Sequence, residues 1–154
     1  MSIVQPWLPG ARVLDLFAGS GALGLEALSR GAARADFVEH AAPSLRALRD
    51  NIATLGAGDR ARITRADAMR VLDRLEAGTY DVAFADPPYG HGLAASVAEH
   101  WLGVRFATVL GIEHSTRETM PPGGQTRTYG STALTVYRDD TPRPAPGDAE
   151  EQGQ

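Results

Sequence analysis

The stretch Asp15-Leu16-Phe17-Ala18-Gly19-Ser20-Gly21-Ala22-Leu23-Gly24 decides the fold class of this chain. It contains the pattern G-x-G-x-x-G, directly after a buried strand predicted at Arg12–Phe17 and at the start of a helix predicted over Ala22–Arg30. Glycines let the backbone turn sharply and approach a ligand closely. The helix N-terminus adds free N–H groups and positive potential. The stretch therefore predicts a ligand-binding turn between the first strand and the first helix.

Strands and helices alternate along the rest of the chain. After the first strand, we predict further strands at Ala35–Glu39, Ala61–Arg65, Tyr80–Ala85, Phe106–Glu113, Thr126–Tyr129 and Ala133–Arg138. Further helices are predicted after Pro43, from the N-cap Asp67 to Ala77, and over Leu93–Leu102. Alternation implies right-handed crossovers and a parallel sheet covered on both faces. We predict a doubly wound, Rossmann-like α/β sheet of order 3-2-1-4-5-7-6 with an antiparallel last strand. Its ligand should lie beyond the carboxyl ends of the strands.

Length and composition limit the alternatives. The 154 residues suit one domain, predicted over residues 1–140, with a Pro-, Gly- and acid-rich disordered tail at 141–154. The chain has no Cys, which excludes disulfide scaffolds and cysteine zinc sites. All 15 basic residues are Arg, which excludes mechanisms that need a lysine. No apolar run is long enough to span a membrane, and Met1–Gly10 does not resemble a secretory signal, so we expect a cytoplasmic protein.

Three acidic residues at predicted strand ends are candidates for cofactor binding. Glu39 lies 24 residues after Asp15, where an acid can accept hydrogen bonds from both ribose hydroxyls of NAD or of S-adenosylmethionine. Asp15 lies four residues before Gly19, where it could contact a cationic amino group but would repel a diphosphate. Asp15 therefore favours S-adenosylmethionine. Asp67 has two compatible interpretations, as a helix N-cap or as an acceptor for the amine of an adenine.

The sequence Asp86-Pro87-Pro88-Tyr89 follows the fourth predicted strand and indicates the reaction. Two prolines fix φ and remove two N–H donors, which leaves the carbonyls and the Asp86 carboxylate as outward acceptors. Acceptors on both hydrogens of a planar exocyclic amine would orient its lone pair towards a methyl donor. Tyr89 offers an aromatic face to a base that has left its stack. This turn therefore predicts methyl transfer to a base amine.

These segments resemble the class I S-adenosylmethionine-dependent methyltransferases that modify amino nitrogens. The resemblance is strongest to the bacterial 16S ribosomal RNA guanine-N2 methyltransferases of the RsmD type, and runs from about Leu8 to Arg138 through Val13–Gly31, Phe37-Val38-Glu39, Asn51, Asp67-Ala68, Phe84–Tyr89 and Tyr129-Gly130. It implies ribosomal RNA or the small ribosomal subunit as partner. It also implies that Glu39 holds the ribose of the cofactor and that Asp67 and Ala68 hold its adenine. The methionine moiety would be held by Asp15, Phe17, Ala18, Gly19, Ser20 and Gly21. The target amine would be held by Asp86, Pro87, Pro88 and Tyr89, with Asp86 also beside the cofactor.

One departure from this family concerns the N-terminus. Its members usually begin with a basic hairpin and a helix that contact RNA, whereas the first strand here begins near Arg12. We therefore expect weak catalysis on free RNA. We also expect Trp7 and Leu8 to fold over the apolar surface left near the first and fourth strands, or a second subunit to cover it. A monomer is the first expectation, and a dimer through that surface is the alternative.

Three other functions share parts of this pattern. An adenine-N6 DNA methyltransferase would share Asp86–Tyr89, a glutamine-N5 protein methyltransferase would typically carry Asn at position 86, and a degenerate module would bind the cofactor without catalysis. The four histidines lack ligand spacing, so we predict no metal site; they are His40, His91, His100 and His114. Arg117 and Arg127 could bind phosphates, but surface arginines are the simpler interpretation.

Overall fold

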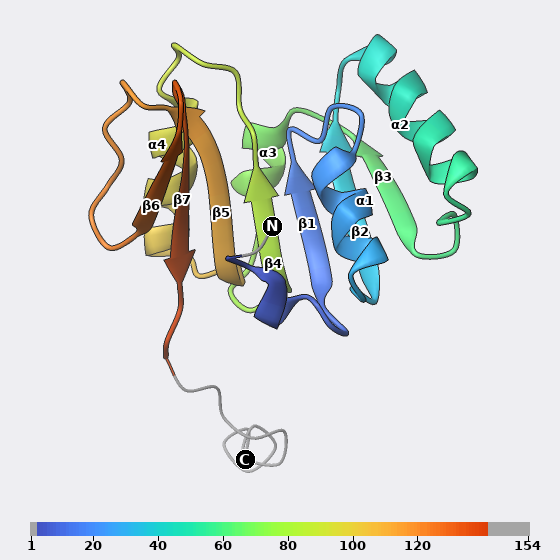
Figure 1. Ribbon diagram of the computed structural model, residues 1–154, viewed down its shortest axis with the longest axis horizontal. Helices are drawn as coiled ribbons and strands as arrows, with labels where there is room; N and C mark the ends of the chain where they lie inside the picture. The colour runs from blue at the N-terminus through green and yellow to red at the C-terminus, as the bar shows by residue number, and fades with distance from the viewer. Residues whose placement is uncertain (1–2, 142–154) are drawn as a thin grey trace.

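The computed structural model describes residues 3–141 and has a seven-stranded sheet in the order β3-β2-β1-β4-β5-β7-β6 (Figure 1). The strands are β1 Arg12–Leu16, β2 Arg34–Glu39, β3 Ala61–Arg65, β4 Tyr80–Ala85, β5 Ala107–Ser115, β6 Gln125–Tyr129 and β7 Thr132–Arg138. The helices are η1 Gln5–Trp7, α1 Ala22–Ser29, α2 Ala42–Thr54, α3 Ala68–Leu72 and α4 Leu93–Gly103. The predicted strand order and fold class are confirmed. The predicted disordered tail lies outside the described residues, apart from Thr141.

The register of the sheet brings the predicted site to one edge. The strands from β3 through β5 pair in parallel, and β7 pairs antiparallel with both β5 and β6. Strand β1 lies between β2 and β4, with Asp15 opposite Phe37 on one side and Phe84 on the other. The order reverses at β1, because β2 lies on one side and β4 on the other. In such sheets the ligand crevice lies at this switch point, beyond the carboxyl ends of the strands.

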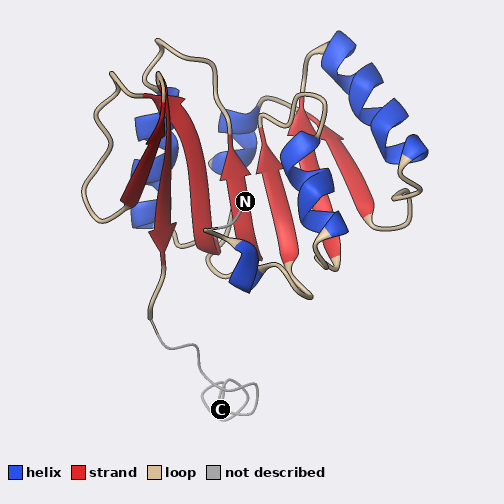
Figure 2. Ribbon diagram, in the orientation of Figure 1, coloured by secondary structure: helices blue, strands red, loops and turns tan. Residues whose placement is uncertain are grey.

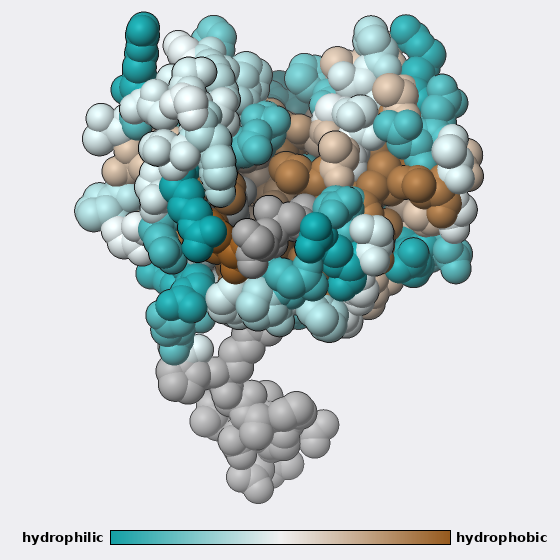
Figure 3. All heavy atoms as spheres, in the orientation of Figure 1, coloured by the Kyte–Doolittle hydropathy of each residue, from teal (hydrophilic) through white to brown (hydrophobic). Residues whose placement is uncertain are grey.

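Helices cover the two faces of the sheet unequally (Figure 2). Helices α1 and α2 pack on one face and α3 and α4 on the other, with a core cluster beneath each pair. On the face of α1, the N-terminal segment with its short helix η1 lies in front of β4, where there is no α-helix, and Figure 3 shows hydrophobic surface in the middle of that face. Leu8 is fully buried there and Trp7 packs against the same cluster. The prediction that both residues fold over this surface is confirmed.

Two predicted elements have different bounds for tertiary reasons. The helix predicted to continue to Ala77 ends at Leu72, and turns lead the chain to Gly78, whose N–H donates to the carbonyl of Arg105 at 2.9 Å. That bond aligns the start of β4 with β5. The fifth strand runs to Ser115 because β7 pairs with it as far as the Ser115–Thr132 pair. Among residues 3–141, no helix is both long enough and apolar enough to cross a membrane.

We expect Gly24→Ala to destabilise the protein. A Cβ at Gly24 would contact the ring of Phe37, 2.8 Å from Cζ, and lie 3.1 Å from Oδ2 of Asp15. Phe37 is fully buried, so its ring cannot move aside freely. The overpacking should lower the free energy of unfolding by about 1–3 kcal/mol, in spite of the better helix propensity of Ala. Chemical denaturation would measure the change. Gly103→Ala, where a Cβ meets nothing within 4 Å, is the matched control; equal stability of the two variants would contradict this account.

Candidate functional site

A cavity of about 490 Å3 lies at the carboxyl ends of β1, β2 and β4. The predicted site residues in its wall are Phe17, Gly19, Glu39, Ala68, Asp86, Pro87, Pro88 and Tyr89. The remaining wall residues were not singled out from the sequence, namely Val38, His40, Ala41 and Ala66. Each of them lies within two residues of a predicted site residue in the chain, which is the signal that could have identified it. The other predicted site residues lie outside this wall, namely Asp15, Ala18, Ser20, Gly21 and Asp67.

The glycine-rich turn is built from left-handed backbone. Gly19 and Gly21 have φ values of 58° and 87°, where a side chain would be strained. Phe17 has φ 57° and is the one non-glycine residue with positive φ in the described part of the chain. A bulky residue in this conformation is unusual and must be held by its surroundings. The Ala18 N–H donates to the Val38 carbonyl at 3.0 Å, and the Asn51 side-chain amide donates to the Ser20 carbonyl at 2.9 Å.

Glu39 connects this turn to the end of β2. One carboxylate oxygen accepts from the Gly19 N–H at 2.8 Å, and the other accepts from the N–H groups of His40 and Ala41, each at 2.9 Å. Burial works to raise the pKa of Glu39, but the hydrogen bonds from Ala41, Gly19 and His40 outweigh it and lower that pKa below its ordinary value. Glu39 is therefore ionised at neutral pH and retains lone pairs for further donors.

Asp15 lies beneath the turn and is almost completely buried. Its Oδ2 accepts from the Gly24 N–H at 3.0 Å, inside α1. Burial is the largest cause that raises the pKa of Asp15 to about 8; the hydrogen bond from Gly24 opposes it, and the nearby carboxylates of Asp86 and Glu39 add to it. Asp15 is therefore a buried acid that is largely protonated at neutral pH. Its predicted contact with an amino group stays a prediction.

Asp67 caps α3. Its Oδ1 accepts from the Met69 N–H at 2.9 Å, which confirms the predicted N-cap. The neighbours of Asp67 on either side, Ala66 and Ala68, line the large cavity, whereas Asp67 itself does not. The adenine contact of its carboxylate stays a prediction, and the two alanines give this end of the cavity a small apolar wall.

The Asp86–Tyr89 turn forms the wall opposite Glu39. Pro87 is buried, whereas Asp86, Pro88 and Tyr89 are exposed. Although Asp86 as a whole residue is exposed, its carboxyl group is partly enclosed. This partial burial, then repulsion by Glu113 and a hydrogen bond with Glu113, raise the pKa of Asp86 to about 6. The Tyr89 hydroxyl lies 3.4 Å from the Thr132 hydroxyl oxygen on β7, with 46% of the residue exposed. The turn thus presents a carboxylate and an aromatic ring at the rim of the cavity.

The residues of this cavity suit a nucleoside cofactor with a positive charge. Ligand pockets usually measure about 300–1,000 Å3, with apolar walls and a few polar groups. Here an ionised carboxylate lies at the end of β2 for ribose hydroxyls, small apolar residues flank a space for a base, and three carboxyl groups lie near the turn. The negative charges of Glu39 and Asp86 disfavour a diphosphate and favour a sulfonium or an amine, which would also favour the ionised form of Asp15.

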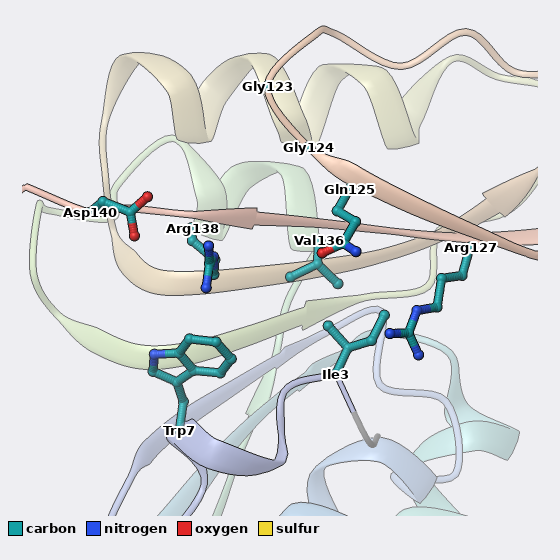
Figure 4. A pocket seen from close by; sticks show the side chains of 9 residues that line it. All are labelled: Ile3, Trp7, Gly123, Gly124, Gln125, Arg127, Val136, Arg138 and Asp140. Carbon is teal, nitrogen blue, oxygen red and sulfur yellow. The ribbon is translucent and has the colours of Figure 1, made fainter.

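A second cavity of about 450 Å3 lies elsewhere, between the N-terminal segment and β6–β7 (Figure 4). It is lined by Ile3, Trp7, Gly123, Gly124, Gln125, Arg127, Val136, Arg138 and Asp140. None of the predicted cofactor-binding or catalytic residues takes part in it. Arg127 faces this cavity, and the Arg138 guanidinium lies 5.6 Å from the ring centre of Trp7. In residues 3–141, no group of three or more His, Cys, Asp or Glu side chains is arranged to hold a metal ion.

We expect Glu39→Ala to weaken cofactor binding about tenfold or more. The substitution leaves three N–H groups without their acceptor and removes the acceptor for ribose hydroxyls. Calorimetric titration with S-adenosylhomocysteine would measure the dissociation constant, with NAD as the competing ligand. Glu99→Ala, on the exposed side of α4, is the matched control. Unchanged affinity in Glu39→Ala would remove Glu39 from the cofactor site, and tighter binding of NAD would identify a different cofactor.

Comparison with known proteins agrees with this geometry. The family described as conserved hypothetical protein 95 matches residues 1–138. The YlbH protein of Bacillus subtilis is 32% identical over 157 residues, which cover 89% of this chain and 80% of that protein. Ribosomal RNA small subunit methyltransferase D of Escherichia coli is 47% identical over 91 residues, which cover 58% of this chain but only 44% of that protein.

A solved structure extends the likeness over nearly the whole chain. A conserved hypothetical protein of Streptococcus pyogenes superposes with a TM-score of 0.79 at 30% identity, covering 90% of this chain and 92% of that one. The family match covers most of the sequence, including every residue of the cavity wall. The chain therefore belongs to the family described as conserved hypothetical protein 95, the RsmD-type methyltransferases, and its cofactor is S-adenosylmethionine.

Proposed function

We propose that this protein transfers a methyl group from S-adenosylmethionine to the N2 amine of a guanine in small-subunit ribosomal RNA. The observation that carries the proposal is that Asp86–Tyr89 and the pair of Gly19 and Glu39 line one cavity. A cofactor held by Gly19 and Glu39 would therefore lie next to an amine held by Asp86–Tyr89. The name of the Escherichia coli relative supports ribosomal RNA as the substrate, and the match spans less than half of that protein.

The residues assigned to the cofactor each offer a suitable contact. S-adenosylmethionine supplies an electrophilic methyl group on a positively charged sulfur. Glu39 would accept the ribose hydroxyls, and the small side chains of Ala66 and Ala68 would flank the adenine. Phe17 and Gly19 would lie along the methionine moiety. Asp15, beneath the turn, would stabilise its positive charge through the low-dielectric interior.

The residues assigned to the target orient an amine and receive its proton. The Asp86 carboxylate and the carbonyl of Pro87 would each accept one hydrogen of the amine, which directs the nitrogen lone pair towards the methyl group. Tyr89 would stack on the base. The N2–CH3 bond forms as the S–CH3 bond breaks, and the amine then releases one proton to the Asp86 carboxylate. A carboxylate whose pKa is about 6 is ionised at neutral pH and is a better proton acceptor than an ordinary Asp.

Methyl transfer from labelled cofactor would test the proposal. The protein is incubated separately with small-subunit ribosomal RNA, assembled small subunits and double-stranded DNA, and each product is digested to nucleosides. The expected product is N2-methylguanosine from RNA or subunits. N6-methyladenine in DNA alone would identify the rival DNA methyltransferase. Cofactor binding without transfer to any of the three would indicate a binding module. The comparison of free RNA with assembled subunits also tests the expectation that free RNA is a poor substrate.

A further inference from the structure

Two carboxylates lie side by side at the carboxyl ends of β4 and β5. Ala85 of β4 is opposite Ile112 of β5, so the next residues along the two parallel strands are Asp86 and Glu113. Both residues therefore lie on the same face of the sheet, and the Glu113 carboxyl is close enough to Asp86 to raise the pKa of Asp86. The sequence did not reveal this pair, because 27 residues separate the two acids. Asp86 has a role in the proposed reaction, and Glu113 does not yet have one.

The surroundings of Glu113 are unfavourable for an isolated charge. It is partly buried and lines a small cavity with apolar side chains, among them Leu23, Phe84 and Leu134. Within residues 3–141, no Arg or His forms a salt bridge with it. A carboxylate placed among apolar groups beside a second carboxylate costs free energy unless hydrogen-bond donors satisfy it. A carboxyl group whose pKa is shifted by burial and by a specific charged neighbour, as that of Asp86 is by Glu113, is characteristic of a functional site.

The aromatic ring of the proposed target site reaches over the same corner of the sheet. The Tyr89 hydroxyl lies 3.4 Å from the hydroxyl oxygen of Thr132. Thr132 is paired with Ser115, two residues beyond Glu113 on β5 and therefore on the same face of the sheet. The ring of Tyr89 thus spans from the end of β4 to β7, across the end of β5. A base stacked on it would present its edge to the strand ends that carry Asp86 and Glu113.

The edge of a guanine matches two adjacent acceptors. Guanine carries two neighbouring donors, the N2 amine and N1–H, whereas adenine places its N6 amine beside N1, which is an acceptor. We propose that Glu113 is a specificity-determining residue that accepts the N1–H of the target guanine while Asp86 accepts the neighbouring N2 amine. This inference rests on the proposed function and names the group that selects the base. In an adenine, the N1 lone pair would meet the Glu113 carboxylate and be repelled.

The proposal also accounts for the charge of the pair. Without a base, the charges of the two adjacent carboxylates repel each other. A bound guanine brings donors to both carboxylates and reduces that repulsion. Flipped bases are commonly read in this way, through hydrogen bonds to the Watson–Crick edge. A site built to bond a donor rejects an analogue that lacks it, because the buried acceptor is then unpaired.

Glu113→Gln and 2-aminopurine together test the contact. The guanine that the labelling experiment identifies is replaced by 2-aminopurine in otherwise identical RNA. This base keeps the C2 amine but has an acceptor at N1. Wild-type protein should lose about 10- to 100-fold in kcat/KM on the analogue. In Glu113→Gln the side-chain amide can donate to N1, so the preference for guanine should fall to about threefold or less. 2-Aminopurine also lacks the O6 of guanine, and this loss affects wild type and Glu113→Gln alike. The difference between their preferences for guanine therefore reports on the contact with N1.

Binding of the analogue gives a readout that does not depend on turnover. With S-adenosylhomocysteine bound, titration followed by 2-aminopurine fluorescence should show tighter binding to Glu113→Gln than to wild type. Glu99→Gln, an exposed substitution on α4, should behave as wild type in both assays. An equal guanine preference in wild type and Glu113→Gln would overturn the inference while leaving the proposed function intact. If wild-type protein places no methyl group on guanine N2, the proposed function fails, and this inference fails with it.

Discussion

Replacement of Asp86 by Ala is expected to lower kcat by about 10²- to 10³-fold, the usual cost of removing one group that stabilises developing charge. Affinity for S-adenosylhomocysteine should change by less than about tenfold, because the hydrogen bonds of Glu39 and the glycine-rich turn do not involve Asp86. The reason is that Asp86 would act on the amine and its proton rather than on the cofactor. Single-turnover methyl transfer and calorimetry would measure the two quantities on one preparation.

Two further variants and a pH profile sharpen this prediction. Asp86→Asn keeps an acceptor oxygen but is a poor proton acceptor, so its rate should lie between wild type and Asp86→Ala. Asp59→Ala, in an exposed turn, is the control. Because the pKa of Asp86 is raised to about 6, wild-type kcat/KM should fall as pH decreases through about 6 and level off above it. A near-normal rate in Asp86→Ala would exclude Asp86 from the reaction.

Asp15→Asn is expected to stabilise the cofactor-free protein and to weaken its cofactor binding. Burial raises the pKa of Asp15 from 3.8 to about 8, so the folded state keeps a proton that the unfolded state releases between these values. The unfolded state therefore binds fewer protons, and this group lowers stability as pH rises, by up to about 1.4 kcal/mol per pH unit. Asn resembles the protonated acid and can still accept from the Gly24 N–H. Denaturation from pH 4 to 8 should show a shallower decline in the variant.

The same substitution is expected to weaken cofactor binding, although it stabilises the cofactor-free protein. A bound cation favours the ionised form of Asp15, so cofactor affinity should rise with pH up to about 8 in wild type, by linkage. Asp15→Asn should bind S-adenosylhomocysteine about tenfold more weakly at pH 8, with little dependence on pH. Asp50→Asn, an exposed substitution on α2, controls for the loss of a charge. Wild-type affinity and pH dependence in Asp15→Asn would mean that Asp15 serves only to hold the turn through Gly24.

The architecture followed from local pattern in the sequence. Alternation of strands and helices, with the glycine-rich turn after the first strand, predicted the doubly wound, mostly parallel sheet that the structure has. This inference works because right-handed crossovers and buried parallel strands leave few arrangements open. Residues at predicted strand ends share one edge for the same reason: Glu39 ends β2 and Asp86 follows β4, and these two parallel strands flank β1. The ends of helices and strands were less predictable, because contacts with segments distant in the chain set them. The chain after Leu72 is held by the bond from Gly78 to Arg105, and β5 ends at Ser115 where its pairing with β7 ends.

The sequence by itself therefore determined the fold, the edge of the sheet that carries the site, and the residue types available there. Only the tertiary structure decided which of those residues share a surface. It placed Asp15 beneath the turn instead of in the cavity wall, twisted Phe17 into a left-handed conformation, and set Glu113 against Asp86. Burial, strain and charge coupling depend on atoms that are distant in the chain, whereas strand and helix signals are local. A carboxylate pair formed across two parallel strands exists only once their register is set.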